Sequence, residues 1–512
     1  MNYLMKIINN QKIKRTIHRS LLYCIVPFIL MVLTCIKNDG TLFFKVKIMI
    51  MTALCLFVLL ISIFYQDRTK IHMLTLVSIL FLGVVYSTII PVGSVPDEVR
   101  HIETAYKVSN IITGDNGKTI NERLDDVNYP YLVNKHTHKQ YEEYWRSIND
   151  PLVNDKMVVT DNLPLKGLQA YLVSGIGISV GRILNLGTAT TLIIGRMLNL
   201  IFASLLLAYA IKQLPCAKEL SFIILTLPMT LQQVMSYSYD MLAITFSFVS
   251  VALFFKLYLM QTKDKEFIKT LVLYIIVSIF FLPLKSFAYV FFLFLLLYIV
   301  VAKFCGKYVP VIERIVIVLC VLLVVLGIGL LIYLHCHPNT IKSIPNYMEW
   351  ANEDGYSVSY VLNHPKKSVQ VLINTYVYRF QYYFIDTLIG TSLGYLDVLV
   401  NVFFQFAFCG LLFISSIKTE NEKCIITKKM RVMFFAIFFI TINAILFAFL
   451  ISYTPFSYPY IMGVQGRYFI PVLLLGGLAV YGRGIKSTEH FQLCLPVVSV
   501  ILNAMVIYNV LD

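Results

Sequence analysis

The chain consists of long apolar blocks separated by shorter polar segments. Blocks such as 291–301 and 315–333 contain no charged residue. Blocks of about 20 apolar residues are long enough to cross the hydrocarbon core of a bilayer. The pattern predicts an all-α, polytopic transmembrane helical bundle with thirteen spans, at residues 20–36, 45–65, 72–92, 189–213, 219–235, 238–259, 268–285, 286–305, 310–334, 396–416, 430–452, 466–482 and 491–510.

A further apolar stretch, 167–185, is interrupted by glycines, and loop charge decides how it is placed. The N-terminal arm has five Lys/Arg residues and no acid, which favours a cytoplasmic N-terminus and puts the large first loop, 93–165, outside. If 167–185 crossed fully, the basic loops 303–314 and 417–431 would face outward. We therefore expect 167–185 to be re-entrant or to lie on the outer surface, with the C-terminus outside.

Composition excludes a soluble protein. Hydrophobic residues make up 58% of the chain and charged residues 14%, whereas soluble domains carry about 25% charged residues. The net charge of +15 is then explained by cytoplasmic loops that meet anionic lipid headgroups, so membrane lipids are expected partners and nucleic acid is not. No cleavage site follows the N-terminal apolar block, which we interpret as a first anchor.

Several chemical signatures are missing. The ten cysteines are scattered, mostly in apolar segments, and form no disulfide or zinc spacing. The His335-Cys336-His337 run has no partner cluster, so a helix-end loop is the simpler interpretation. Without a Walker A loop, a dinucleotide fingerprint or a His-Glu-x-x-His motif, ATP-driven transport and zinc proteolysis are not expected.

The first outer loop opens with Ser94-Val95-Pro96-Asp97-Glu98-Val99-Arg100-His101. Proline and a Ser-x-x-Asp pattern favour a helix start, and Asp97 and His101 share one face of that helix. Asp97 either caps the helix or acts as a general base at the membrane surface, where partial desolvation beside an imidazole suits proton acceptance. Glu98 is the rival for the role of base.

Charged residues within apolar segments form the second group of candidates, because charge is costly there. They are Arg196, Asp240, Lys285 and Arg467, all placed near the outer leaflet by the span assignment. Lysine and arginine near helix ends also snorkel to headgroups, which is the alternative explanation. If the cations converge, they suit the phosphate of a lipid carrier. Gly466, just before Arg467, is expected to let backbone approach a ligand closely.

Both tryptophans, Trp145 and Trp350, fall in expected outer loops. Interfacial anchoring is the ordinary explanation for such residues. Stacking against a sugar ring is the alternative.

The polar motifs together resemble a known group of bacterial membrane proteins, domain of unknown function family 2142, which is placed in the clan of GT-C glycosyltransferases. The resemblance is carried, in order, by Pro96-Asp97-Glu98-x-x-His101, Gly195-Arg196, Pro228-Met229, Ser236-x-Ser238-x-Asp240, the Lys285 region, Gly394-x-Leu396-Asp397 and Gln465-Gly466-Arg467-Tyr468-Phe469-x-Pro471. It covers roughly residues 80–480. Val99 and Arg100 depart from the usual motif, and the Tyr-Pro-Pro that often precedes the ambiguous segment is absent.

The resemblance implies a GT-C-like core at 71–485, with outer loops 93–165 and 335–395, two additional spans and a basic arm in 1–70, and a C-terminal span in 486–512. It implies a bacterial plasma-membrane enzyme that moves a sugar from a polyprenyl-phosphate donor to a glycan or cell-wall acceptor on the outer face. A flippase for lipid-linked glycans and a polysaccharide polymerase or ligase are the alternatives.

In that scheme three residues near the start of the first loop are catalytic, three cations hold the donor phosphate, and three more residues bind substrate. The catalytic residues are Asp97, Glu98 and His101. The donor-phosphate ligands are Arg196, Lys285 and Arg467. The substrate-binding residues are Asp240, Gln465 and Tyr468. No cofactor is assigned. A divalent cation stays open, because two adjacent carboxylates alone do not establish a metal site.

Overall fold

The computed structural model describes residues 11–114, 119–133, 136–161, 167–262, 264–304, 344–420, 422 and 425–512. The expected span at 310–334 and the His335-Cys336-His337 run lie outside these ranges. Within them the structure is mostly helical, so the predicted all-α class is confirmed. The strands form short antiparallel pairs: β1 (Ile120–Arg123) with β2 (Met157–Asp161), β3 (Asn346–Met348) with β4 (Glu353–Gly355), and β5 (Ser392–Leu393) with β6 (Val398–Leu399).

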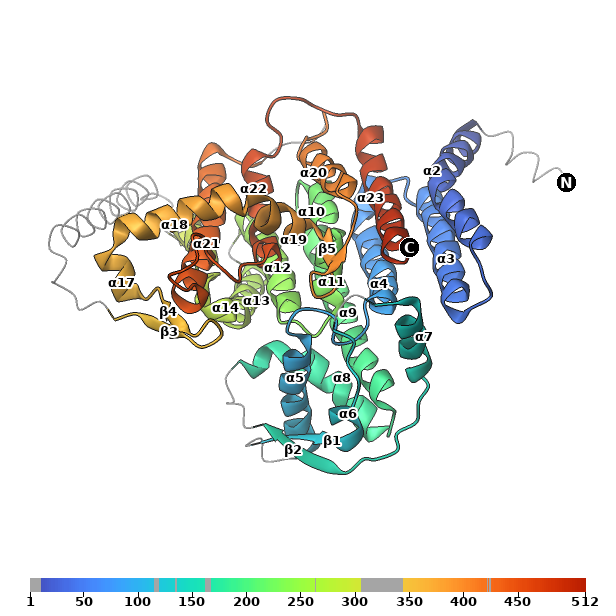
Figure 1. Cartoon of the computed structure of the whole chain (residues 1–512). Helices are drawn as coiled ribbons and strands as arrows, with labels where there is room; N and C mark the ends of the chain where they lie inside the picture. Colours follow the sequence, from blue (N-terminus) through green and yellow to red (C-terminus); the bar gives the residue numbers. More distant parts are fainter. Residues whose placement is uncertain are drawn as a thin grey trace.

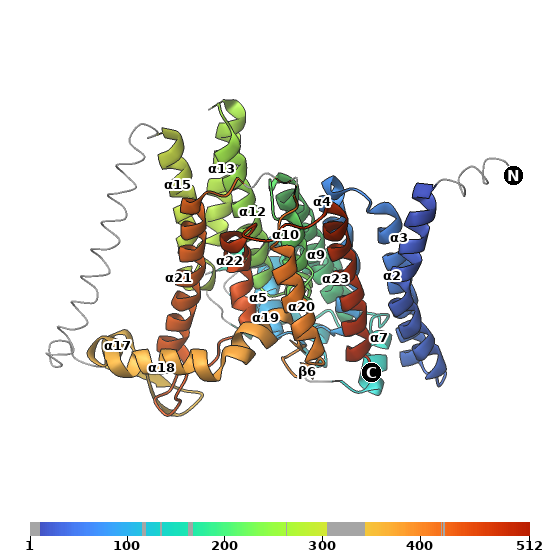
Figure 2. The same ribbon diagram turned by 90° about the horizontal axis from the view of Figure 1, so that it is seen from above.

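Seven helices in the described part of the chain are long and apolar enough to cross a membrane. They are His18–Ile36 within α2 (Gln11–Ile36), α3 (Leu42–Phe64), η1 with α4 (Arg68–Ile89), α9 (Thr188–Gln213), α12 (Asp240–Leu259), α21 (Lys428–Tyr453) and α23 (Glu489–Val510). Shorter helices accompany them: α13 (Lys265–Phe281), α15 (Leu293–Phe304), α20 (Phe403–Ser415) and α22 (Ile470–Val480). Figure 2 shows these helices side by side, as a polytopic bundle requires. The number of thirteen spans stays a prediction.

The segment 219–235, expected to form one span, is not one continuous helix. It forms two helices of eight residues each, α10 (Lys218–Leu225) and α11 (Pro228–Met235). Pro228 favours the break, because it lacks an N–H and its ring clashes with the preceding turn, and here it occupies the first turn of α11. The carbonyl exposed at the break, that of Thr226, accepts a hydrogen bond from Asn503 Nδ2 of α23 at 2.9 Å.

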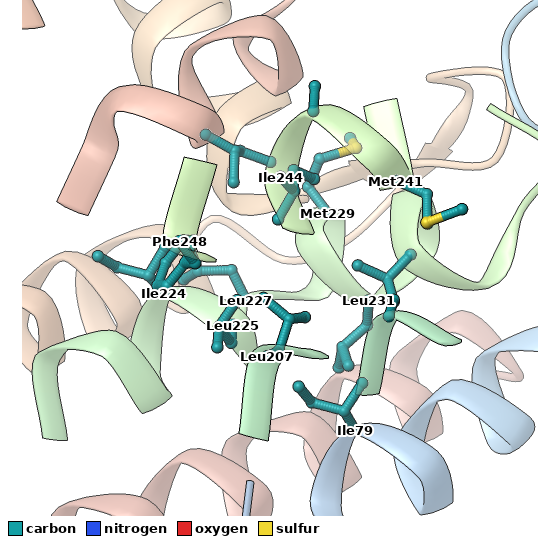
Figure 3. Packing of buried hydrophobic residues seen from close by; sticks show 14 of the residues in the cluster. Ile79, Leu207, Ile224, Leu225, Leu227, Met229, Leu231, Met241, Ile244 and Phe248 are labelled. Atoms are coloured by element: carbon teal, nitrogen blue, oxygen red, sulfur yellow. The ribbon is translucent and has the colours of Figure 1, made fainter. Parts of the chain in front are cut away.

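The two short helices lie in the middle of the bundle. Figure 3 shows their apolar side chains interdigitating with Ile79 of α4, Leu207 of α9 and Phe248 of α12. All three side chains are fully buried. A break inside the bundle is therefore surrounded by protein rather than by lipid, which is where irregular backbone is tolerated at membrane depth.

The glycine-rich segment that was expected to be re-entrant or on the surface forms η2 (Leu168–Tyr171) and α8 (Leu172–Ile183). Twelve residues of α-helix span about 18 Å, too little to cross a bilayer core. Its glycines bring α8 against its neighbours: a Cβ on Gly177 would lie 2.5 Å from the Cα of Gly195 on α9. Small residues thus fix the packing of the helix that carries Arg196.

Successive helices alternate in direction, so one end of the bundle collects the ends of α4, α13 and α21 and the starts of α9, α12 and α22 (Figure 2). We call this the cluster end. The short helices α17 (Val358–Asn363) and α18 (Pro365–Tyr378) lie across it. Figure 1 shows α5 (Glu98–Thr113), α6 (Leu124–Val127), α8 and the β1–β2 pair grouped to one side of the bundle, with α7 (His138–Ser147) nearby.

Candidate functional site

Asp97 stands at the start of α5, just after α4 leaves the bundle. Its backbone is left-handed, with φ 64° and ψ 8°, and its side chain does not cap the helix. The expected Ser-x-x-Asp capping box is therefore wrong; Ser94 Oγ instead donates to the carbonyl of Leu132 at 2.6 Å. The Asp97 side chain is 59% exposed, and its Oδ2 lies 3.5 Å from Arg467 Nη2. This carboxylate is accessible and held beside a cation.

Glu98 is in the opposite situation, because its side chain is completely buried. Its carboxylate accepts hydrogen bonds from Arg196 Nε at 2.9 Å and Nη2 at 2.6 Å, and from the backbone N–H groups of Gly93 at 2.9 Å and Tyr237 at 3.2 Å. A carboxylate that is paired and shielded in this way cannot reach an acceptor hydroxyl. Of the two carboxylates, Asp97 is therefore the one that an incoming group can reach.

Arg196 belongs to the same buried unit, which corrects its expected role as a phosphate ligand. Besides Glu98, its guanidinium donates to the carbonyls of Ile90 at 2.6 Å and Pro91 at 2.9 Å. Its side chain is completely buried. These four hydrogen bonds connect α9 to residues 90–98, the segment that leads into α5. Arg196 and Glu98 thus fix the backbone next to Asp97 from inside the bundle, and neither side chain is accessible to a substrate.

Arg467 is the center of the group that does converge. It lies at the start of η6 (Gly466–Phe469), and its Nε is 3.4 Å from Asp240 Oδ2 at the start of α12. Its Nη1 lies 3.4 Å from the carbonyl of Pro96 and 3.3 Å from Gln233 Oε1. The guanidinium therefore joins α11, α12, η6 and the start of α5, although these elements are up to 371 positions apart.

Lys285 approaches the same place from the turn between α13 and α15. Its Nζ donates to Tyr239 Oη at 2.6 Å and lies 3.3 Å from the center of the Tyr468 ring. The Tyr468 hydroxyl in turn accepts from Arg467 Nη2 at 3.4 Å. Tyr468 thus separates two cations, and the aromatic faces offset part of their repulsion.

The turn that presents Lys285 is strained. Lys285, Ser286 and Phe287 have φ values of 52°, 53° and 64°, so three successive residues with side chains adopt the left-handed conformation. Each costs about 1–2 kcal/mol relative to right-handed backbone. Strain of this kind collects at functional sites, where the surrounding structure enforces it. The sequence placed a boundary between two spans at 285–286, but it gave no sign of the left-handed backbone.

Three buried polar atoms in the cluster have no hydrogen-bond partner in the described part of the chain: Asp240 Oδ1, Gln465 Oε1 and Arg467 Nε. Buried polar groups are nearly always paired. Arg467 Nε is still in ion-pair distance of Asp240 Oδ2, so the acceptor Asp240 Oδ1 is the atom of the cluster most available to a ligand. Gly466 contributes differently from expectation, because its Cα faces the backbone of Leu388 rather than the cluster.

His101 closes the cluster on the α5 side. Its Nδ1 lies 2.8 Å from Tyr171 Oη, and its ring meets that of Tyr239 edge-on at 5.3 Å. Burial, together with the positive charge of Arg467, lowers the pKa of His101 to about 4. The imidazole is therefore neutral at pH 7 and adds no charge to the cluster.

Sequence reasoning missed the contributions of Gln232, Gln233 and Tyr395. Gln232 accepts from the N–H of Gly394 at 2.9 Å and donates to its carbonyl at 3.1 Å, which anchors the β5–β6 turn. Tyr395, in that turn, has its pKa raised by partial burial and by the nearby Asp97 carboxylate. Two adjacent glutamines in an apolar segment were the available signal. Within the described residues, no group of three or more His, Cys, Asp or Glu side chains is placed to hold a metal ion.

Comparison with known proteins gives one match. The family model described as predicted membrane protein (DUF2142) matches residues 80–475, which is most of the chain and contains every residue of the cluster. No curated protein matches the chain, and no solved structure matches it.

Proposed function

The chain belongs to the DUF2142 family of predicted membrane proteins, and we propose that it transfers a sugar from a polyprenyl-phosphate donor to a glycan acceptor at the outer face of a bacterial plasma membrane. The observation that carries the proposal is the exposed Asp97 carboxylate held 3.5 Å from the buried Arg467 guanidinium, with Lys285 on the other side of Tyr468. A glycosyl transfer from lipid phosphate needs a base and cations.

Loop charge supports the outward placement of the cluster. The loops at the opposite end of the bundle carry basic residues, namely Lys212, Lys218, Lys265, Lys269, Lys303, Lys418 and Lys428. Helix α2 also begins at that end (Figure 2), and Arg19 in its third turn donates to Gln66 between α3 and η1. Basic loops favour the cytoplasmic side. The cluster end then faces outward, at the depth of the outer headgroups.

In the proposed reaction, Asp97 takes the proton from an acceptor hydroxyl. The acceptor oxygen forms a bond to the anomeric carbon, the bond from that carbon to the phosphate oxygen breaks, and the phosphate leaves with the electron pair. Arg467 and Lys285 stabilise the charge that develops on the phosphate, which is an electrostatic contribution to catalysis. One displacement of this kind inverts the anomeric configuration.

The remaining residues orient these groups. Asp240 pairs with Arg467 Nε and keeps one oxygen free for a sugar hydroxyl, while Tyr468 lies between Arg467 and Lys285. Gln465, just before η6, has a buried amide oxygen without a partner in the described residues, and we assign it to substrate binding. His101, neutral and bonded to Tyr171, acts as a packing and orienting group one helical turn after Asp97. A base and paired cations on one side of the bundle favour transfer over transport, which requires a path through the membrane.

The test is transfer activity in membranes that contain Asp97→Asn. The probe is polyprenyl-phosphate sugar purified from the producing cells, labelled in the sugar and incubated with their envelope glycan. Loss of a general base predicts a fall in turnover of about 10²–10⁴-fold. Glu143→Gln, which removes an exposed carboxylate on α7, is the matched control and should leave turnover unchanged. Near-normal turnover by a folded Asp97→Asn protein refutes the assignment of Asp97.

A further inference from the structure

An uninterrupted row of aromatic rings leads from the protein surface to the cluster. Trp350, in the β3–β4 turn, stacks on Tyr453 with ring centers 5.0 Å apart and planes 17° apart. Tyr453 meets Phe449 edge-on at 6.5 Å, and Phe449 stacks on Tyr468 at 5.4 Å. Tyr468 carries Lys285 on its face. Trp350 is thereby joined to the proposed donor-phosphate ligands by ring contacts alone.

Trp350 and Tyr453, the residues of the row nearest the surface, are partly exposed to solvent. Trp350 is 46% exposed although Tyr453 and Tyr458 both pack against its ring. Tyr453 and Tyr395 are 40% and 44% exposed, and Tyr347, in the same hairpin as Trp350, is 59% exposed. We call these four residues the aromatic strip. Tyr395 follows Gly394, whose backbone bonds Gln232 on α11. The neighbouring Gln233 contacts Arg467, so the β5–β6 turn places Tyr395 beside the cluster.

The other tryptophan shows what a structural tryptophan looks like in this protein. Trp145 is buried, packs on Phe43 and Tyr141, and donates its indole N–H to the carbonyl of Thr88 at 3.0 Å. Trp350 has no such burial. Packing therefore explains the position of Trp145, whereas the exposure of Trp350 needs another explanation.

Charge distinguishes a sugar surface from a lipid anchor. Aromatic residues that anchor a protein in anionic headgroups usually have lysine or arginine beside them. The β3–β4 hairpin itself, residues 346–355, carries Glu349, Glu353 and Asp354 and no lysine or arginine. The lysine that follows on α18, Lys367, lies over the rings of Tyr356, Tyr360 and Phe456, which are not part of the strip. Carboxylates accept hydrogen bonds from sugar hydroxyls, and flat aromatic faces cover the apolar faces of sugar rings.

We propose that the aromatic strip binds the acceptor glycan and directs the end of that glycan to Asp97. The proposal rests on the proposed function for its direction of transfer and adds the location and chemical class of the acceptor, a neutral or cationic chain of several sugar rings. The donor then enters from the Lys285 side, so that donor and acceptor meet at Asp97 from opposite sides of Tyr468.

Trp350 is itself the probe for a binding test. The full-length protein is placed in nanodiscs of phosphatidylcholine, and the signal of Trp350 is taken as the difference between wild type and Trp350→Phe, since Trp145 is common to both. Aqueous iodide should quench this signal, and envelope glycan fragments from the producing cells should protect it. Phosphatidylcholine brominated in its acyl chains should not quench it.

Two results overturn the proposal. Quenching of Trp350 by the brominated lipid means that the strip is a membrane anchor. Absence of protection by all envelope glycan fractions means that the strip does not bind the acceptor.

A kinetic test separates the strip from the function on which it rests. Trp350→Ala should raise the KM for the acceptor about tenfold, the factor expected for losing an aromatic binding residue, with kcat and the donor KM unchanged. Trp350→Phe should restore most of the affinity. Tyr378→Ala, at a residue 67% exposed on α18, is the matched control. Normal acceptor KM in Trp350→Ala, with transfer intact, refutes the strip alone. Glycan protection of Trp350 without any sugar transfer by the wild-type protein refutes the proposed function alone.

Discussion

The ion pair between Glu98 and Arg196 should dominate the stability of the cluster end, and Glu98→Gln tests this. The substitution keeps the shape of the side chain but removes the charge, and the new amide N–H₂ faces the N–H donors of Arg196. Removing one partner of a buried ion pair costs about 3–5 kcal/mol. Arg196 keeps its bonds to the carbonyls of Ile90 and Pro91, so we expect the lower end of this range.

The assay is equilibrium unfolding of the purified protein in mixed micelles with an increasing fraction of denaturing detergent. Glu103→Gln is the matched control, because Glu103 pairs with the exposed Arg100 at 2.5 Å and should contribute at most about 1 kcal/mol. Removing both charges, with Glu98→Gln and Arg196→Gln together, should recover part of the loss, since no unpaired charge then stays buried. If Glu98→Gln destabilises the protein no more than Glu103→Gln does, the pair does not hold α9 to residues 90–98 as described above.

Two further predictions concern the cluster itself. Arg467→Lys should weaken donor binding by at least about tenfold, because a lysine cannot reproduce the planar, multiple contacts to Asp240, Gln233 and a phosphate; unchanged donor KM in the transfer assay would contradict the role of Arg467. His101 should make the protein less stable in acid. Its pKa in the folded protein is about 4, below the ordinary value of 6.5, so the unfolded chain binds the proton at a higher pH than the folded chain does. The free energy of unfolding should therefore fall as the pH drops from about 6.5 to about 4, by up to about 3 kcal/mol. Unfolding curves of wild type and His101→Gln between these pH values should converge in acid, and parallel curves would rule out this origin.

Local patterns in the sequence were sufficient to predict the helical class and the long membrane helices, because lipid requires every backbone polar group to be satisfied within a helix. Pro228 indicates the break at 226–227, but the apolar run on both sides of it is equally typical of one continuous helix. The left-handed turn at Lys285 was not predictable, because three residues with side chains adopt it under the constraint of the surrounding bundle.

The candidate site was predicted in part. Asp97, Asp240, Lys285 and Arg467 stood out because charge is costly in apolar segments, and the structure brings these four together. Arg196 stood out for the same reason, yet Glu98, 98 positions away in the sequence, offsets the free-energy cost of burying its charge. Nothing local to Asp97 and Glu98 tells which of two adjacent carboxylates faces the core, because that depends on the rotation of α5 against α9. Contacts over such distances are a property of the fold.

The most direct test of the central claim uses a polyprenyl-phosphate sugar labelled with ³H in the sugar and ³²P in the phosphate, supplied to membranes that contain either wild-type protein or Asp97→Asn. The account predicts that wild type moves ³H into the envelope glycan while ³²P stays with the lipid, and that Asp97→Asn leaves both labels together. If wild type only carries the intact, doubly labelled lipid across the membrane, or if Asp97→Asn separates the labels as fast as wild type, the account is wrong.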